Sequence, residues 1–377
     1  MRNRTKLCVN FSILENNFNL LKKIAPKNEV LFMVKANAYG HGMVPIVQYS
    51  NQRLKIKEFG VATIEEGVYL RDSLNSLKFD IYVFSDIQLD LEVNFNLYRN
   101  RRITPVISCL EDLNIFLQSS AFKHLPLVLK FNTGMNRLGL MKTDLIECIS
   151  LLKKYKRMNI THLMSHFASS FLPIDKIKKT NEQLRCFNEI KRSFRDNGIT
   201  IEKTSIANSG AIEQKIGLDE SHIRPGLMLY GPSSLVEPFR SRNIWEGQNI
   251  SKLETTIISV FPVKKGDPLG YGAIPSPDDG IIGIISIGYG DGFLSLYQGA
   301  KFQYKGSIAR VVGRVSMDMA HILFPTSAIK KLHVGETFQI WGHNSLELLD
   351  LSDRLKRIPY ELFCQLSPRI PRVYNLN

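Results

Sequence analysis

Charged and polar side chains follow several short apolar runs between the N-terminus and Tyr230. Lys35 comes at the end of one run in VLFMVKANAYGHG, and Arg137 follows another in LKFNTGMNRLG. One lysine at a strand end can simply extend its amine to water, so Lys35 alone would indicate little. Several such run ends together indicate a site. The group comprises Lys35, Lys130, Arg137, His166, Asn208, Ser209 and Arg224.

These residue types suit an aldehyde and two anions. A desolvated lysine such as Lys35 can form an imine with an aldehyde, and Arg137 can bind a carboxylate. Hydroxyls and backbone amides suit a phosphate; the candidates are Tyr39, Ser209, Gly226, Leu227 and Tyr360. An aldehyde, a phosphate and an amino-acid carboxylate together point to pyridoxal 5'-phosphate and an amino-acid substrate.

The run ends must be positioned by strands that alternate with helices. Phe11, Leu14, Phe18 and Leu21 have helical spacing, and Thr63 with Glu66 and Ser108 with Glu111 form possible capping boxes. The apolar runs occupy residues 30–34, 59–62, 81–84, 103–107, 125–129, 160–164, 204–207 and 222–224. This alternation predicts an α/β fold, a (β/α)8 TIM-type barrel, although an open doubly wound sheet fits the same count.

A second domain is predicted after Pro232, where helical periodicity fades. Strand-like runs separated by Gly, Pro and Asp follow, at residues 253–263, 280–287, 307–315 and 336–341. We therefore expect a barrel over residues 1–240 and a C-terminal, mostly β domain over residues 241–377.

Composition narrows the class of protein. The chain has 377 residues with 44% hydrophobic and 22% charged, which excludes a mainly disordered protein. No apolar run approaches the roughly 18 residues of a membrane span, and the first residues contain no signal-peptide core. Five scattered cysteines favour neither a disulfide framework nor a zinc site. The sequence predicts a cytoplasmic protein with reduced cysteines.

The net charge of +14 comes from 49 Lys and Arg against 35 Asp and Glu. The densest basic runs, at residues 153–157, 176–179 and 191–195, fall in segments of helical period and predict solvated helix faces. No nucleic-acid-binding motif accompanies them. The GYGDG turn lacks the lysine of a phosphate loop, and His162 and His166 lack the glutamate of a zinc helix. We therefore expect no nucleic acid, no membrane and no metal.

Separated motifs along nearly the whole chain resemble those of the alanine racemase family, which are barrel-type pyridoxal-phosphate enzymes. The motifs occur in family order. They are VKANAYGHG (34–42), TGMNRLG (133–139), SHFA (165–168), ANSGA (207–211), RPGLMLYG (224–231), LGYGA (269–273), IGYGDGF (287–293), GRVSMDM (313–319) and IPYELFCQLSPRIPRVY (358–374).

The resemblance implies two catalytic bases. Lys35 would carry the cofactor as an aldimine and serve as one base, and Tyr271 would be the other, delivered by the second subunit of a homodimer. Two bases are expected because racemisation removes a proton from one face of a planar carbon and returns one to the opposite face. Arg224 would lie at the pyridine nitrogen, which would stay unprotonated because a guanidinium only donates. His166 would link Arg224 to Tyr271.

The other matching positions would bind ligands. Arg137 and the backbone amide of Met317 would hold the substrate carboxylate, and Lys130 matches a position that can be carbamylated beside Arg137. The phosphate would contact Tyr39, Ser209, Gly226, Leu227 and Tyr360, with Asn208 beside them. Two residues depart from the family pattern. Asn132 replaces a common Asp near Arg137, and Phe171 replaces an acidic residue of the access corridor in some members.

The implied activity is the interconversion of L-alanine and D-alanine, which supplies D-alanine for peptidoglycan. Serine or another small amino acid is an alternative substrate. A barrel-type pyridoxal-phosphate decarboxylase is a second alternative, but such enzymes typically place an acid, not Arg224, at the pyridine nitrogen. A cofactor carrier without catalysis would not need the β domain that holds Tyr271.

Overall fold

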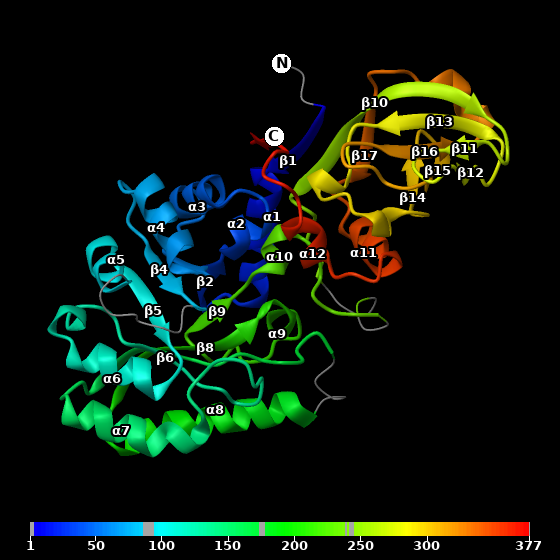
Figure 1. Cartoon of the computed structure of the whole chain (residues 1–377). Coiled ribbons are helices and arrows are strands. Elements are labelled where there is room, and N and C mark those ends of the chain that lie inside the picture. Colours follow the sequence, from blue (N-terminus) through cyan, green and yellow to red (C-terminus); the bar gives the residue numbers. More distant parts are fainter. Residues whose placement is uncertain (1–3, 86–93, 173–177, 238–239, 241–244, 377) are drawn as a thin grey trace.

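Eight parallel strands form a closed barrel in the computed structural model, which describes residues 4–85, 94–172, 178–237, 240 and 245–376, without the side chains of 329–331 (Figure 1). The barrel closes because the last strand pairs with the first, with Ile223 opposite Val30. The strands are β2 (Glu29–Met33), β3 (Glu58–Val61), β4 (Asp80–Val83), β5 (Ile103–Ile107), β6 (Val128–Lys130), β7 (Asn159–Met164), β8 (Thr200–Asn208) and β9 (His222–Arg224).

Each predicted apolar run overlaps one of these strands, so the predicted barrel is confirmed and the open sheet is excluded. Short runs of buried β-branched residues carry this signal, because a parallel strand is covered on both faces. All five residues of β5 are buried. Inside the barrel, Leu31, Tyr82, Val106, Val128 and Met164 pack together.

Helices surround the barrel. In α1 the residues Phe11, Leu14 and Leu21 are buried at the predicted helical spacing. The helices of this part are α1 (Phe11–Ile24), α2 (Lys35–Tyr39), α3 (Met43–Gln52), α4 (Ile64–Ser73), α5 (Asn94–Arg101), α6 (Leu110–Gln118), α7 (Leu145–Lys154), α8 (Lys178–Asp196), α9 (Ser209–Glu213) and α10 (Leu227–Tyr230).

Of the two predicted capping boxes, one forms in part and the other is wrong. Thr63 caps α4 by accepting from the Glu66 amide, but the Glu66 carboxylate bonds the amides of Ala62 and Asn37. At α6 the cap is Cys109 instead of Ser108, and its sulfur accepts from the amide of Asp112. A thiol in the cap position is unusual, so residue preference pointed one residue too early.

The second domain is built on a largely antiparallel sheet with two helices. Its strands are β10 (Ser251–Val263), β11 (Pro268–Leu269), β12 (Ile274–Pro275), β13 (Gly280–Ile285), β14 (Lys301–Tyr304), β15 (Ser307–Val312), β16 (Ala320–Phe324), β17 (Thr337–Trp341) and β18 (Arg372–Asn375). Its helices are α11 (Ser345–Arg354) and α12 (Pro359–Cys364). The four predicted strand runs correspond to β10, β13, β15 and β17.

The N-terminal strand differs from the expected division at residue 240. β1 (Thr5–Asn10) pairs antiparallel with β10 and parallel with β18, so it belongs to the sheet of the second domain (Figure 1). Its main partner lies far along the chain, with Thr5 opposite Thr255. A local pattern cannot reveal so distant a partner. Both ends of the chain are therefore held by the β domain.

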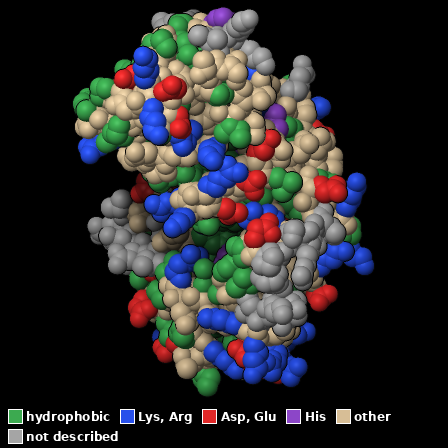
Figure 2. All heavy atoms as spheres, turned by 90° about the vertical axis from the view of Figure 1, so that its right-hand side faces the viewer, with side chains coloured by type: hydrophobic (Ala, Val, Ile, Leu, Met, Phe, Trp, Pro, Cys, Tyr) green, Lys and Arg blue, Asp and Glu red, His purple; other side chains and the backbone are tan. Residues whose placement is uncertain are grey.

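Basic side chains lie on the outer helices, as predicted. Residues 153 and 154 end α7 and residues 155–157 follow it, residues 191–195 lie on α8, and residues 176 and 177 lie outside the described part. Figure 2 shows Lys and Arg gathered at the lower end of the molecule, where Figure 1 places these two helices, and mixed with Asp and Glu elsewhere. Within the described residues, no helix is long and apolar enough to cross a membrane.

Candidate active site

A cavity of about 340 Å³ lies at the carboxyl ends of the barrel strands. Barrel enzymes bind their substrates at this end. The predicted site residues that line it are Lys35, Tyr39, Lys130, Arg137, His166, Asn208, Ser209, Arg224, Gly226 and Tyr360. Tyr360 comes from α12 of the β domain, so both domains of one chain build the cavity. Residues predicted for one site therefore line one cavity, although they lie as far apart in the sequence as Lys35 and Tyr360.

A larger groove of about 770 Å³ lies among β14, β17 and α11. Its charged side chains are Lys301, Glu347, Asp350 and Arg354, all of them exposed and balanced in sign. In contrast, the barrel cavity combines buried cations with hydroxyls, so the barrel cavity is the candidate active site.

Lys35 is followed by a turn of left-handed backbone. The φ angles of Ala36, Asn37, Ala38 and Tyr39 are 52°, 54°, 54° and 52°. For residues other than glycine this conformation costs about 1–2 kcal/mol each. Asn37 holds the turn, because its amide donates to the Glu66 carboxylate and its side-chain oxygen accepts from the Met43 amide at 2.8 Å. The turn directs Lys35 and Tyr39 to the same cavity.

The cavity is cationic. Lys35, Lys130, Arg137 and Arg224 line it, and no Asp or Glu is among its described lining residues. Burial, followed by the charge of Arg137, lowers the pKa of Lys35. Burial and the three neighbouring cations lower the pKa of Lys130 to about 8. Such a site is matched to an anionic ligand, and a lysine with a lowered pKa is a better nucleophile at neutral pH.

Arg224 is buried, and its hydrogen bonds within the protein all go to neutral acceptors. It donates to the hydroxyl of Ser205, to the carbonyl of Ser165 and, at 3.3 Å, to Nδ1 of His166. Burial and the neighbouring cations lower the pKa of His166 well below its usual value, so the ring is neutral. Nδ1 accepts from Arg224, and Nε2 lies 3.4 Å from the side-chain amide nitrogen of Asn208, which is also a donor.

Hydroxyls and a glycine form a small cradle beside the arginine. The Ser209 hydroxyl accepts from the amides of Gly226 at 2.9 Å and Met228 at 3.4 Å. The rings of Tyr39 and Tyr360 lie 5.5 Å apart between centroids. A Cβ at Gly226 would lie 2.5 Å from the Tyr39 hydroxyl, so only glycine leaves this space open. Leu227 follows as the first residue of α10.

Asn132 organises the loop that carries Arg137. Its side-chain oxygen accepts from the amides of Gly134 and Asn136, each at 3.0 Å, and its amide donates to the Asn136 side chain at 3.2 Å. An aspartate could accept in the same way but could not donate. The departure at Asn132 therefore preserves support for the loop. Phe171, the other departure, is 41% exposed and does not line the cavity.

Tyr271 and Met317 lie outside the cavity of their own chain. Tyr271 is at the tip of the turn between β11 and β12, with Gly270 and Gly272 at positive φ, and is 72% exposed. Met317 lies in the loop between β15 and β16 and is 53% exposed.

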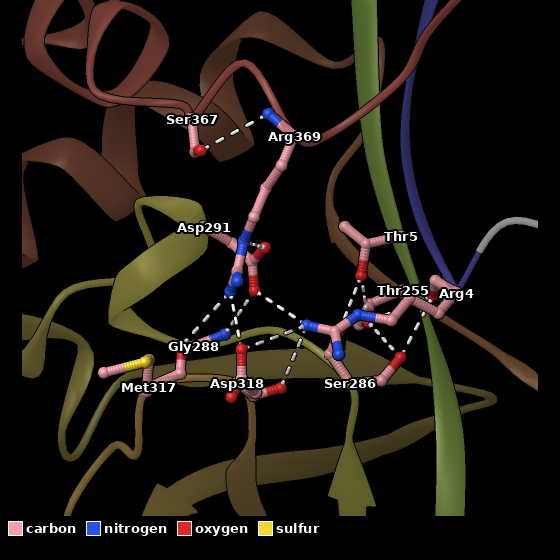
Figure 3. A network of polar contacts seen from close by, with 10 residues as sticks. All are labelled: Arg4, Thr5, Thr255, Ser286, Gly288, Asp291, Met317, Asp318, Ser367 and Arg369. Carbon is pink, nitrogen blue, oxygen red and sulfur yellow. Dashed lines mark hydrogen bonds and ion pairs between the residues drawn. The ribbon is translucent and has the colours of Figure 1, made fainter.

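A network of ion pairs and hydrogen bonds supports the loop that contains Met317 (Figure 3). Buried Asp291 accepts from Arg369 at 2.7 Å and from Arg4 at 3.2 Å, and Arg369 also donates to Asp318 at 2.8 Å. The network joins both ends of the chain to this loop. Sequence reasoning missed Asp291 and Arg369 as supports, although each lies inside a quoted motif. It also missed Ser165 and Ser205. Both are buried inside the barrel, and serine as a residue type does not predict burial there.

No group of three or more potential metal ligands occurs among the described residues. The fold and the site define a barrel enzyme whose cationic, lysine-containing cavity suits a phosphorylated carbonyl compound and an amino acid. Residues 9–234 match the family "Alanine racemase, N-terminal domain", and residues 250–374 match "Alanine racemase, C-terminal domain". The chain therefore belongs to the alanine racemase family, as its motifs predicted.

Individual relatives are similar over their full length. An alanine racemase from Aeromonas hydrophila subsp. hydrophila is 31% identical over 375 residues, which is 96% of this chain and 97% of that protein. One from Coxiella burnetii (strain CbuG_Q212) is 30% identical over 374 residues, or 98% of each chain. The crystal structure of alanine racemase from Bartonella henselae with covalently bound pyridoxal phosphate is 25% identical, with a TM-score of 0.84 over 99% of this chain and 100% of that one.

Proposed function

We propose that the protein interconverts L-alanine and D-alanine with pyridoxal 5'-phosphate held at Lys35. The observation that carries this proposal is the convergence of Lys35, Arg224 and the Ser209–Gly226 cradle on one cavity in a chain of this family. Arg224 also argues against a decarboxylase, because decarboxylases built on this barrel typically place an acid, not an arginine, at the pyridine nitrogen of the cofactor. Serine or another small amino acid remains the alternative substrate.

The cavity fits the cofactor. The hydroxyls of Tyr39, Ser209 and Tyr360 and the open space at Gly226 suit its phosphate. Arg224 would donate to its ring nitrogen, and the lowered pKa of Lys35 favours the neutral amine that bonds its aldehyde. When bound, the cofactor would draw electrons from Cα of the amino acid and so weaken its C–H bond.

The proton would be moved by Lys35 on one face of Cα and by Tyr271 of a second copy on the other. The exposure of Tyr271 and its absence from its own cavity support a homodimer with shared sites. If the neutral His166 carries its proton on Nε2, opposite the Nδ1 that accepts from Arg224, it would donate to the Tyr271 oxygen and ease loss of the phenol proton. Arg137 and the Met317 amide of the second copy would hold the substrate carboxylate.

We also propose that the product D-alanine serves peptidoglycan synthesis in the cytoplasm. The five cysteines are all unpaired, which is usual in a reducing compartment.

The purified protein, incubated with pyridoxal 5'-phosphate, should be assayed by chiral chromatography on L- and D-alanine, serine and other small amino acids. We expect a visible absorption band and racemisation fastest with alanine, both lost in Lys35→Ala. A colourless wild-type protein, or a band equally strong in Lys35→Ala, would overturn the cofactor assignment. If serine is turned over faster than alanine, then serine is the preferred substrate.

A further inference from the structure

Polar side chains continue inside the barrel below Arg224, outside the cavity lining. Ser205 on β8 and His162 on β7 are both fully buried, and His222 on β9 and Glu58 on β3 are nearly so. Buried polar groups are costly without partners, so their presence in the centre of an apolar barrel calls for a reason. None of these residues has a role in the function proposed above.

The hydrogen bonds in this column, which runs from Arg224 through Ser205 to His162, favour one set of directions. Arg224 donates from Nη1 to the Ser205 oxygen, because a guanidinium has only donors. The single Ser205 proton is then free for Nε2 of His162, which lies 2.9 Å from the Ser205 oxygen. In this arrangement His162 accepts at Nε2 and carries its own proton on Nδ1, which has no hydrogen-bond partner among the described residues. The opposite tautomer would leave the Ser205 proton without an acceptor as well as Nδ1 without a donor.

The surroundings of His162 keep it neutral. Its ring lies between the rings of Tyr82, 5.9 Å away, and His222, 5.0 Å away between centroids. Burial and the nearby charges of His222, Arg224 and Lys203 lower its pKa well below the usual value. At the far end of the column, Glu58 pairs with Lys203 at 2.6 Å. No carboxylate of the described residues pairs with Arg224, so its charge faces the cavity uncompensated.

We propose that His162 and Ser205 are positioning residues for Arg224. By accepting the Ser205 proton, His162 turns the lone pairs of the hydroxyl toward Nη1. This fixes the plane of the guanidinium, and with it the direction of the donors that face the cavity and His166. The two neutral groups do this without a counter-charge that would weaken the positive potential at the site. The consequence for catalysis rests on the proposed function, but the hydrogen-bond order does not.

The hydrogen-bond order can be tested without activity. In the holoenzyme labelled with ¹⁵N-histidine, the nitrogen signals of His162, assigned by their loss in His162→Gln, should indicate a neutral ring with the proton on Nδ1. A neutral ring protonated on Nε2, or a charged ring at neutral pH, would overturn the proposal.

The positioning role can be tested by paired variants. Ser205→Ala and His162→Phe remove the hydrogen bonds, whereas Ser205→Thr and His162→Gln keep a hydroxyl or an acceptor. We expect the first pair to lower kcat roughly tenfold and to shift the absorption band of the bound cofactor, with KM for alanine changed far less. The second pair should recover most of both properties. Ser50→Ala, at another fully buried serine, should change neither.

Unaltered kcat and absorption in Ser205→Ala and His162→Phe would refute the positioning role. The positioning role would also be refuted if the losses of kcat correlate with lowered thermal stability of the variants and Ser205→Thr and His162→Gln do not recover them. An inactive wild-type enzyme would instead refute the proposed function, and the nitrogen signals would still decide the hydrogen-bond order.

Discussion

Lys130 is a buried amine among cations, without a carboxylate in the cavity lining to neutralise it. A lysine with a pKa of about 8 is largely protonated at pH 7 and largely neutral at pH 9. Only the neutral amine adds carbon dioxide, with release of a proton, to form a carbamate. The carbamate would place a negative group beside Arg137 and relieve the repulsion. The lowered pKa thus supports the expectation that Lys130 is carbamylated.

The carbamate should be detectable by ¹³C NMR in protein incubated with ¹³C-bicarbonate. At a fixed concentration of dissolved carbon dioxide, we expect its rate of formation to rise between pH 7 and pH 9, as the neutral fraction of Lys130 rises, and to level off above. Lys130→Arg keeps the charge and should lack the signal. A signal of equal strength in that variant would assign it to another amine, such as the N-terminus.

Tyr271 is the residue whose loss should separate catalysis from cofactor binding. Tyr271→Phe removes one phenol oxygen at an exposed position, so we expect little change in folding or in the cofactor absorption band. Racemisation should fall by a factor of about 10² or more, the range of a general acid–base group. Tyr69→Phe, at an exposed tyrosine of α4, is the matched control. Near-normal turnover in Tyr271→Phe would exclude the two-base role.

At the scale of elements, the loop between β6 and α7 positions Arg137, which we propose to bind the substrate carboxylate. Asn132→Asp keeps the acceptor for two loop amides, so KM for alanine should change less than about threefold. Asn132→Ala removes the acceptor and should raise KM about tenfold or more, with cofactor affinity unchanged. Steady-state kinetics together with a cofactor titration check both variants. Equal KM values in the two variants would mean that Asn132 does not support the loop.

The strands of the barrel could be predicted because their signal is local. The run 103–107 is apolar apart from Thr104 and is buried throughout, and burial on both faces favours that pattern. β1 was out of reach because its partners β10 and β18 lie at the other end of the chain. The left-handed turn at residues 36–39 was also out of reach, because three of its residues are not ones that favour positive φ.

The candidate site was predictable to the extent that its residues stand at strand ends. Lys35, His166 and Arg224 follow apolar runs, and barrel geometry brings such ends together. Tyr360 and Tyr271 follow no barrel strand. The hydroxyl of Tyr360 made it a candidate for binding a phosphate, and only the resemblance to a family drew attention to Tyr271. Ser205 and His162 lie within strands, where a sequence pattern does not distinguish a buried hydrogen-bond chain from an ordinary sheet position.

For the whole molecule, the β domain has two relations to the site. It closes its own cavity with Tyr360, while Tyr271 and Met317 face away from that cavity. The network around Asp291 ties the Met317 loop to both chain ends, so this outward face is held rigidly. The exposed Tyr271 and Met317 can act in catalysis only if this face packs against the cavity of another subunit.

Shared sites make a prediction for mixed dimers. Lys35→Ala and Tyr271→Phe homodimers should both be nearly inactive. When the two chains are coexpressed with different tags and the mixed dimer is purified, one of its sites carries both defects and the other carries neither. Its activity should therefore be about half that of the wild-type dimer. If each chain completed its own site, every site would keep one defect, and the mixed dimer would stay as inactive as its parents. A Lys35→Ala dimer with both tags controls for the purification.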